Sequence, residues 1–345
     1  MDDLTTLTSL ENLPPETKRM AALGEMLKKG KVDEADVKAL QATIDQAQAD
    51  VPYLQLMVIA LASAHPAPLR ADHPALACLT TLLEKRFPAL ARSAAAQALN
   101  QLGKVPEAAV TLLCTMLFDD DEQVRESALL TLTSIVAVAA PQIGAAVSAA
   151  PVAAWTRHAT LALARSAGEW PSRQRSVVLF LQHGLASGAP AATVIAGYVV
   201  LAQVVGDCGA VAALGEAACD SSRPEQSKEA FAALAQLALL AKAAVPVLAG
   251  ALEASELPWH EALLCQTLPK IGANAESIPL ARSVQRVQSA ADEAAAAHCM
   301  LLSLFASGSE EAAAAIVARY PAASEALKPL LKQGFRAIAG RELAA

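Results

Sequence analysis

The chain has 345 residues and a formal net charge of −7, and 54% of the residues are hydrophobic, 3% aromatic and 18% charged. Alanine and leucine, which favour helices, supply much of the hydrophobic content, whereas the residue types that favour strands are comparatively scarce. The composition predicts an all-α fold and argues against sandwiches, barrels and parallel-sheet enzymes. The acidic balance offers no cationic surface for phosphates, so we expect no nucleic acid and no membrane as a partner.

Residues 1–70 are expected to form an N-terminal helical cap and a degenerate repeat. The pattern indicates helices over 15–29, 34–49 and 52–64. The first of these helices is rich in lysine and arginine, which suits the polar outer face of a terminal repeat. The N-terminus is acidic and has no apolar core typical of a signal peptide, so we expect a cytoplasmic protein.

Residues 71–322 repeat with a period of about 34 residues. A first helix of each unit carries large apolar residues at helical spacing, at Leu76/Leu79/Leu83, Val110/Leu113/Leu117, Val178/Leu181/Leu185, Val211/Leu214/Ala218, Val245/Leu248/Leu252 and, more weakly, Ala313/Ile316/Tyr320, Gly144/Val147 and Ala281/Val284. A second helix carries a residue pair four apart, at Ala95/Leu99, Ala128/Leu132, Ala196/Val200, Ala230/Leu234, Leu263/Thr267 and Ala297/Leu301. The small first residue of most pairs lets helices approach closely, so each unit is predicted to be a helical hairpin.

Short turns separate the two helices of a unit, at 118–121, 187–190, 221–224 and 255–258. Their acidic and hydroxyl residues are suited to cap the second helix, and proline fits its first turn. We interpret Asp119, Asp120 and Asp121 as such a cap, because a cation site would need further oxygen ligands.

Residues 323–345 are expected to close the array with one or two capping helices. No linker long enough to divide the chain is visible. The sequence therefore predicts one continuous α-α superhelix, a solenoid of about eight to nine helical hairpins.

Two long segments, 127–156 and 176–206, carry no charge but are interrupted by proline and glycine, so neither is expected to cross a bilayer. Within the second, the helix 191–205 is apolar on nearly every side. Either its neighbours enclose it, which we favour, or it forms an exposed docking patch or a homodimer seam.

The residues Leu117–Leu132 and Val245–Gly272 resemble the HEAT repeat family, and the resemblance covers most of the chain from about residue 73 onward. In that family the second helix tends to open with Asp, then Val-Arg, then a small residue. The matching positions are Asp121, Val124, Arg125 and Ala128, with Arg92 at the equivalent place one unit earlier. Later units depart from the pattern, since Trp259 and His260 stand where Val-Arg would be.

Motifs that would indicate an enzyme are missing from the sequence. There is no GxGxxG, P-loop, GxSxG, HExxH or CxxC. The six cysteines (Cys78, Cys114, Cys208, Cys219, Cys265 and Cys299) are scattered through apolar stretches and are expected to be buried free thiols. We therefore expect no catalytic residues, no cofactor and no metal.

The alternative to a non-enzymatic protein is an enzyme built on the same scaffold. Two enzyme families among the helical-repeat proteins are considered. Deoxyhypusine hydroxylase, of the HEAT type, binds iron through repeated His-Glu pairs, but His260–Glu261 is the one such pair here, and we expect a surface histidine beside a solvated glutamate. The pair His298–Cys299 and the trio His65, His73 and Cys78 lack the spacing of a zinc site. HEAT-like DNA glycosylases need a basic concave surface, whereas the basic residues here are dispersed.

The favoured hypothesis is a non-enzymatic scaffold or adaptor that binds one or more proteins on its concave face. Residues next to the core stripe of the second helices should face that side. The candidate partner-binding residues are Arg125, Thr131, Arg157, Thr193, Tyr198, Gln226, Trp259, His260 and Gln266. They combine polar and aromatic side chains, as the centres of interfaces do.

Overall fold

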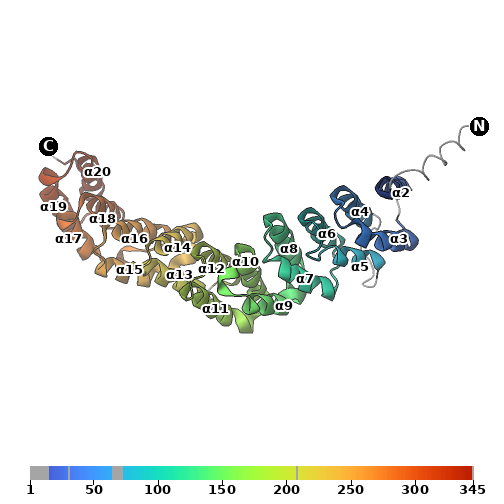
Figure 1. The fold of residues 1–345 in the computed structure, drawn as a ribbon. Coiled ribbons are helices and arrows are strands. Elements are labelled where there is room, and N and C mark those ends of the chain that lie inside the picture. Colours follow the sequence, from blue (N-terminus) through green and yellow to red (C-terminus); the bar gives the residue numbers. More distant parts are fainter. Residues whose placement is uncertain (1–14, 30–31, 64–72, 207–208, 344–345) are drawn as a thin grey trace, which may run out of the picture. The chain divides into compact units, whose positions relative to one another are not determined.

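The computed structural model describes residues 15–29, 32–63, 73–206 and 209–343, and its regular elements there are α-helices and short 3₁₀ helices. Contacts within the chain divide it into two compact units, Met1–Trp170 and Pro171–Ala345. In both units consecutive helices pair as hairpins, and each hairpin packs on the next (Figure 1). The predicted all-α helical-repeat fold is confirmed. That the array is continuous across residue 170 stays a prediction.

The described residues of the first unit form helix α2 and four hairpins. Its helices are α2 (Pro15–Lys29), α3 (Glu34–Ile44), α4 (Val51–Ser63), α5 (Pro74–Thr81), α6 (Ala89–Leu102), α7 (Glu107–Met116), α8 (Glu122–Ser134), α9 (Val136–Ala149) and α10 (Arg157–Ser166). The second helices α4, α6, α8 and α10 form one row, and the first helices α3, α5, α7 and α9 form another (Figure 1). Helix α2 packs on α4 alongside this row, and its role as a cap stays a prediction.

The described residues of the second unit form five hairpins. Its helices are α11 (Gln174–Ala186), α12 (Ala191–Val205), α13 (Ala210–Cys219), α14 (Pro224–Leu237), α15 (Val245–Ala254), α16 (Pro258–Lys270), α17 (Leu280–Ser289), α18 (Asp292–Phe305), α19 (Glu310–Arg319) and α20 (Lys328–Ala339). The second helices α12, α14, α16, α18 and α20 pack in one row (Figure 1). Helix α20 contacts both α18 and α19, so the segment predicted as a cap supplies the second helix of a further hairpin.

The buried stripes follow the predicted repeat, with shifts of one or a few residues in four helices. On the second helices the fully buried pairs are Gly197/Leu201 in α12, Leu264/Leu268 in α16 and His298/Leu302 in α18, each one residue beyond the predicted pair. On α17 the buried pair is Ser283/Val287 in place of Ala281/Val284. Alanine and small residues fit either register, so the sequence pattern did not separate adjacent positions in these helices.

The turn before α8 forms the predicted cap. The Asp121 carboxylate accepts a hydrogen bond from the backbone N–H of Val124 at 3.1 Å. Asp119 is buried and forms an ion pair with Arg92, with Arg92 Nη2 and Asp119 Oδ1 3.0 Å apart. Arg125 Nη1 donates to the carbonyls of Asp119 at 2.6 Å and Asp120 at 2.9 Å. Arg92 and Arg125 therefore hold this turn together.

The apolar helix α12 is mostly enclosed, with eight of its 15 residues buried. Among the described residues, one helical stretch, Pro224–Ala254, is long and apolar enough to cross a membrane by length and composition. It comprises α14, the 3₁₀ segment Ala238–Ala244 and α15, and the φ angle of Ala238 is 50° where the chain leaves α14. One such stretch is weak evidence, because core helices of soluble proteins pass the same test.

Gly334 of α20 lies directly against Cys299 of α18. A Cβ atom at this position would overlap Cys299 Sγ, whereas a Cβ atom on the exposed Gly250 of α15 would meet no atom within 4 Å. We predict that G334A lowers the free energy of unfolding by about 1–3 kcal/mol through overpacking. Chemical denaturation of the full chain measures this loss.

The matched control for this prediction is G250A, which should be neutral or stabilising by up to about 1 kcal/mol because alanine favours helices. In the double variant G334A/C299A the two effects should be less than additive, since removing the sulfur removes the overlap. Strict additivity would show that the two residues do not contact each other.

Candidate functional site

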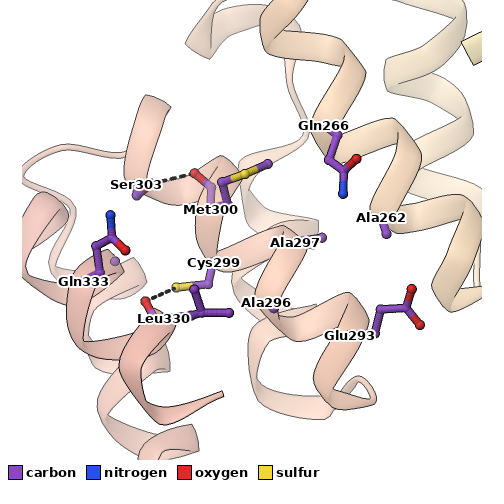
Figure 2. A pocket seen from close by; sticks show the side chains of 11 residues that line it. Ala262, Gln266, Glu293, Ala296, Ala297, Cys299, Met300, Ser303, Leu330 and Gln333 are labelled. Carbon is purple, nitrogen blue, oxygen red and sulfur yellow. Dashed lines mark hydrogen bonds between the residues drawn. The ribbon is translucent and has the colours of Figure 1, made fainter. Parts of the chain in front are cut away.

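A groove of about 470 Å³ lies on the second helices α16, α18 and α20 (Figure 2). Its lining residues are Ala262, Gln266, Glu293, Ala296, Ala297, Cys299, Met300, Ser303, Leu330, Gln333 and Gly334. Gln266 lies on the α16 side, and Gln333 and Leu330 lie on the α20 side (Figure 2). We call this cavity the α16–α20 groove.

The repeat itself generates the groove. Ala262, Ala296 and Leu330 occupy equivalent positions on three successive second helices, and Gln266 and Met300 form a second such row. Small residues on α16 and α18 leave space that larger side chains would fill. The floor is closed at Cys299, whose thiol lies 3.7 Å from the Leu330 carbonyl and is buried.

The chemistry of the groove is suited to binding. Cys299 is not a nucleophile at neutral pH, because burial raises the pKa of its thiol to about 11. Gln266 and Gln333 are exposed, and each amide offers both a donor and an acceptor. The arrangement can therefore hydrogen-bond a polar chain.

A buried polar cluster lies behind the groove, between α16, α17 and α18. It consists of Glu261, Cys265, Ser283, Arg286 and His298, and all but the arginine are fully buried. Arg286 Nη2 donates to Glu261 Oε2 at 2.6 Å, and His298 Nδ1 shares a hydrogen bond with Ser283 Oγ at 3.1 Å. Cys265 Sγ lies 3.7 Å from the same ring nitrogen.

Two atoms of this cluster face each other without a hydrogen bond. Glu261 Oε1 and His298 Nε2 are buried, have no partner, and lie 3.9 Å apart. Burial, followed by the charges of Arg286 and Arg282, lowers the pKa of His298 to about 4. The imidazole is therefore neutral at neutral pH, and the carboxylate is balanced by Arg286.

The expectation of a surface His260 beside a solvated Glu261 is wrong, because both side chains are buried. His260 Nδ1 lies 3.1 Å from Ser255 Oγ, and His260 Nε2 lies 3.1 Å from the Ala218 carbonyl oxygen. Glu261 belongs to the polar cluster instead. Within the described part of the chain, no group of three or more His, Cys, Asp or Glu residues is placed to hold a metal ion.

The other sequence-based ligand candidates are also engaged in local structure. His73 caps α5, because its ring accepts a hydrogen bond from the Ala75 N–H at 3.2 Å. His65 and Cys208 lie outside the described residues. Of the remaining cysteines, Cys78, Cys114, Cys265 and Cys299 are buried free thiols, whereas Cys219 is half-buried.

The nine predicted partner-binding residues do not form one site. Thr131, Thr193, Tyr198 and His260 are buried, so these side chains stabilise the repeats. Arg125, Gln226 and Trp259 are half-buried, and Arg157 and Gln266 are exposed. Among these nine residues, only Gln266 lines the α16–α20 groove.

A smaller cavity of about 290 Å³ lies among α11, α12, α13 and α14. Two predicted residues, Tyr198 and Gln226, line it, and the Tyr198 hydroxyl has no hydrogen-bond partner. Burial and the neighbouring Glu216 raise the pKa of this hydroxyl, so it is protonated at neutral pH. Its charged lining is mixed, since Arg223 Nε lies 3.7 Å from Asp220 Oδ2.

Several groove residues on α16 and α18, of which the sequence analysis predicted only Gln266, lie two positions on either side of the buried stripe. Leu264 is flanked in this way by Ala262 and Gln266, and His298 by Ala296 and Met300. Two residues correspond to about 200° of helix rotation, so these positions face away from the core. With the stripe assigned one residue early, the predicted binding face was rotated by about 100°.

Comparisons with known proteins do not identify a family. No protein-family model and no curated protein matches the chain. A crystal structure of an engineered protein is similar at 19% sequence identity, with a TM-score of 0.37, over 98% of this chain and 89% of that chain.

The polar cluster predicts a pH-dependent stability. The pKa of His298 is about 4 in the folded chain against 6.5 for an unperturbed histidine, so the unfolded chain binds the extra proton between these values. The free energy of unfolding should fall by about 3 kcal/mol as the pH is lowered from about 6.5 to about 4. Denaturant titrations across this range measure the slope.

The H298Q variant should lose this part of the pH dependence. The control variant H183Q, at an exposed position on α11, should keep it. An unchanged slope in H298Q would show that another group is responsible.

Proposed function

We propose that this protein is a non-enzymatic HEAT-repeat scaffold or adaptor that binds segments of other proteins across its second helices. The observation that supports this proposal most directly is the α16–α20 groove, which is open and is lined by amides and small residues. Stacked hairpins expose a long surface for a polypeptide, and surfaces of this kind usually serve protein binding.

The HEAT assignment within the helical-repeat class rests on the turn before α8. The positions that match the family, Asp121 and Arg125, cap α8 and hold the preceding carbonyls, respectively. Arg92 makes the buried ion pair with Asp119 at the same junction. These contacts explain why aspartate and arginine stand at the positions that match the family pattern.

No observation favours the alternative of an enzyme on this scaffold. A di-iron hydroxylase needs several exposed His-Glu pairs, whereas His260 and Glu261 are buried and occupied by other partners. A glycosylase needs an aromatic platform on a basic surface. Trp155 is buried and Trp259 packs beside His260, with the ring centroids 5.2 Å apart.

We also propose that the protein acts in the cytoplasm, since the five described cysteines are free thiols, which suits a reducing compartment. In a homodimer, the groove of one molecule would hold a segment of a second copy. Measurements of molecular size at increasing protein concentration, made alongside the binding experiment, distinguish this outcome.

The groove hypothesis predicts that a bulky residue on its floor abolishes binding. Ala296 is half-buried and lines the open groove, so tryptophan there fills the cavity without entering the core. A random dodecapeptide library is selected on the full chain, and synthetic copies of the selected peptides are titrated by fluorescence anisotropy. A296W should weaken their binding at least about tenfold, because the side chain occupies the site.

The matched control is A281W, which adds the same side chain at an exposed position on α17. This variant should bind the peptides as the unmodified chain does, and circular dichroism should show both variants folded. Recovery of no peptide, or of peptides whose affinity is the same in A296W, would refute the proposed function.

A further inference from the structure

The α16–α20 groove contains one charged side chain, Glu293, among its eleven lining residues. Glu293 is exposed, and its carboxylate has no ion pair with any described residue. Its neighbour Asp292 is different, since Asp292 Oδ1 pairs with Arg319 Nη2 at 2.6 Å. The groove therefore carries a single uncompensated negative charge.

The polar groups around this charge are also unoccupied. The amides of Gln266 on α16 and Gln333 on α20 have no hydrogen-bond partner among the described residues. Each amide can satisfy one N–H and one C=O of a peptide backbone. An extended chain, whose backbone groups are not paired with one another, presents this combination at both edges.

The third feature is an apolar rim. Met300 on α18 and Leu330 on α20 are 40% and 47% exposed, and Leu304, one turn beyond Met300, is 56% exposed. Methionine adapts its shape to different apolar partners. A partner that covers this rim removes apolar surface from water, which supplies affinity, while the amides and the carboxylate determine which segments fit.

From these three features we propose that the groove binds an extended polypeptide segment that carries a lysine or arginine beside apolar residues, with the cationic group at Glu293. The proposal rests on the proposed function and specifies its partner. An acidic segment is excluded by the sign of the charge, because no cationic side chain lines the groove. The cationic side chain also has an apolar stem, which can pack on Ala296 and Ala297, one turn along α18 from Glu293.

The expected size of the preference follows from the exposure of Glu293. Exposed ion pairs contribute little, and partial enclosure by a bound peptide strengthens them. We expect a lysine-containing segment to bind about fivefold more tightly than the same segment with glutamine, and the ratio to shrink as salt screens the charge.

The experiment uses two readouts on the full chain. The first is the composition of dodecapeptides selected from the random library, restricted to peptides whose binding is lost in A296W. The second is anisotropy with three acetylated and amidated peptides of the sequence Gly-Ser-Leu-X-Leu-Gln-Leu-X-Ser-Gly, in which X is lysine, glutamine or glutamate. Titrations at about 50 mM and about 300 mM sodium chloride give the salt dependence.

The variant E293Q should bind the lysine and glutamine peptides equally, and a library selected on it should lose the enrichment in lysine and arginine. E293D should retain a preference. The matched control E253Q removes an exposed carboxylate from α15, outside the groove, and should leave the preference unchanged.

The possible results separate the two proposals. Groove-dependent peptides without enrichment in basic residues, or equal affinities for the lysine and glutamine peptides, would overturn the inference and leave the proposed function standing. A preference that persists in E293Q would also overturn it, because the charge would then act from elsewhere. Absence of any groove-dependent peptide would overturn both.

Discussion

Each hairpin of this chain can bury its apolar stripe only against the next hairpin, and this constraint explains most of the sequence. Large residues recur on the inner faces, such as Leu113, Leu214 and Leu248, and small residues recur where second helices approach each other. Because each hairpin depends on its neighbours alone, the outer faces of the second helices are free to vary. The α16–α20 groove is one result of that freedom, since alanine on two helices leaves a hollow that leucine would fill.

The groove and the polar cluster share the helices α16 and α18. On α16, Glu261 faces the core and Ala262 faces the groove, and on α18 the same relation holds for His298 and Ala297. The polar contacts of Glu261 and His298 on the core side of α16 and α18 therefore help to fix the distance between these two helices. If the groove binds a polypeptide as proposed, a fixed polar network behind it keeps its shape before the partner arrives, which lowers the entropy lost on binding.

The sequence was sufficient to predict the hairpins, their approximate number and many of their turns. Leucine spacing, Asp121 and the prolines that begin helices are local signals, so they can be read without the fold. It did not determine the register of α12, α16, α17 and α18, where alanine and small polar residues occupy inner and outer positions alike. It also did not reveal the burial of Glu261. A buried carboxylate depends on a partner from another element, and Arg286 lies 25 residues further along the chain. The groove was missed for the same reason, since its position depends on the register.

The polar contacts resolve the ambiguity that alanine creates. In an array of similar apolar hairpins, a neighbour shifted by one residue loses little hydrophobic contact. The shift is costly where buried polar groups must meet, as at Ser93 Oγ and Ser127 Oγ, 2.7 Å apart on α6 and α8. At α16 the same shift would separate Glu261 from Arg286 and leave a buried charge unpaired, which costs about 3–5 kcal/mol. These few contacts therefore select one register among many that hydrophobic packing alone would accept.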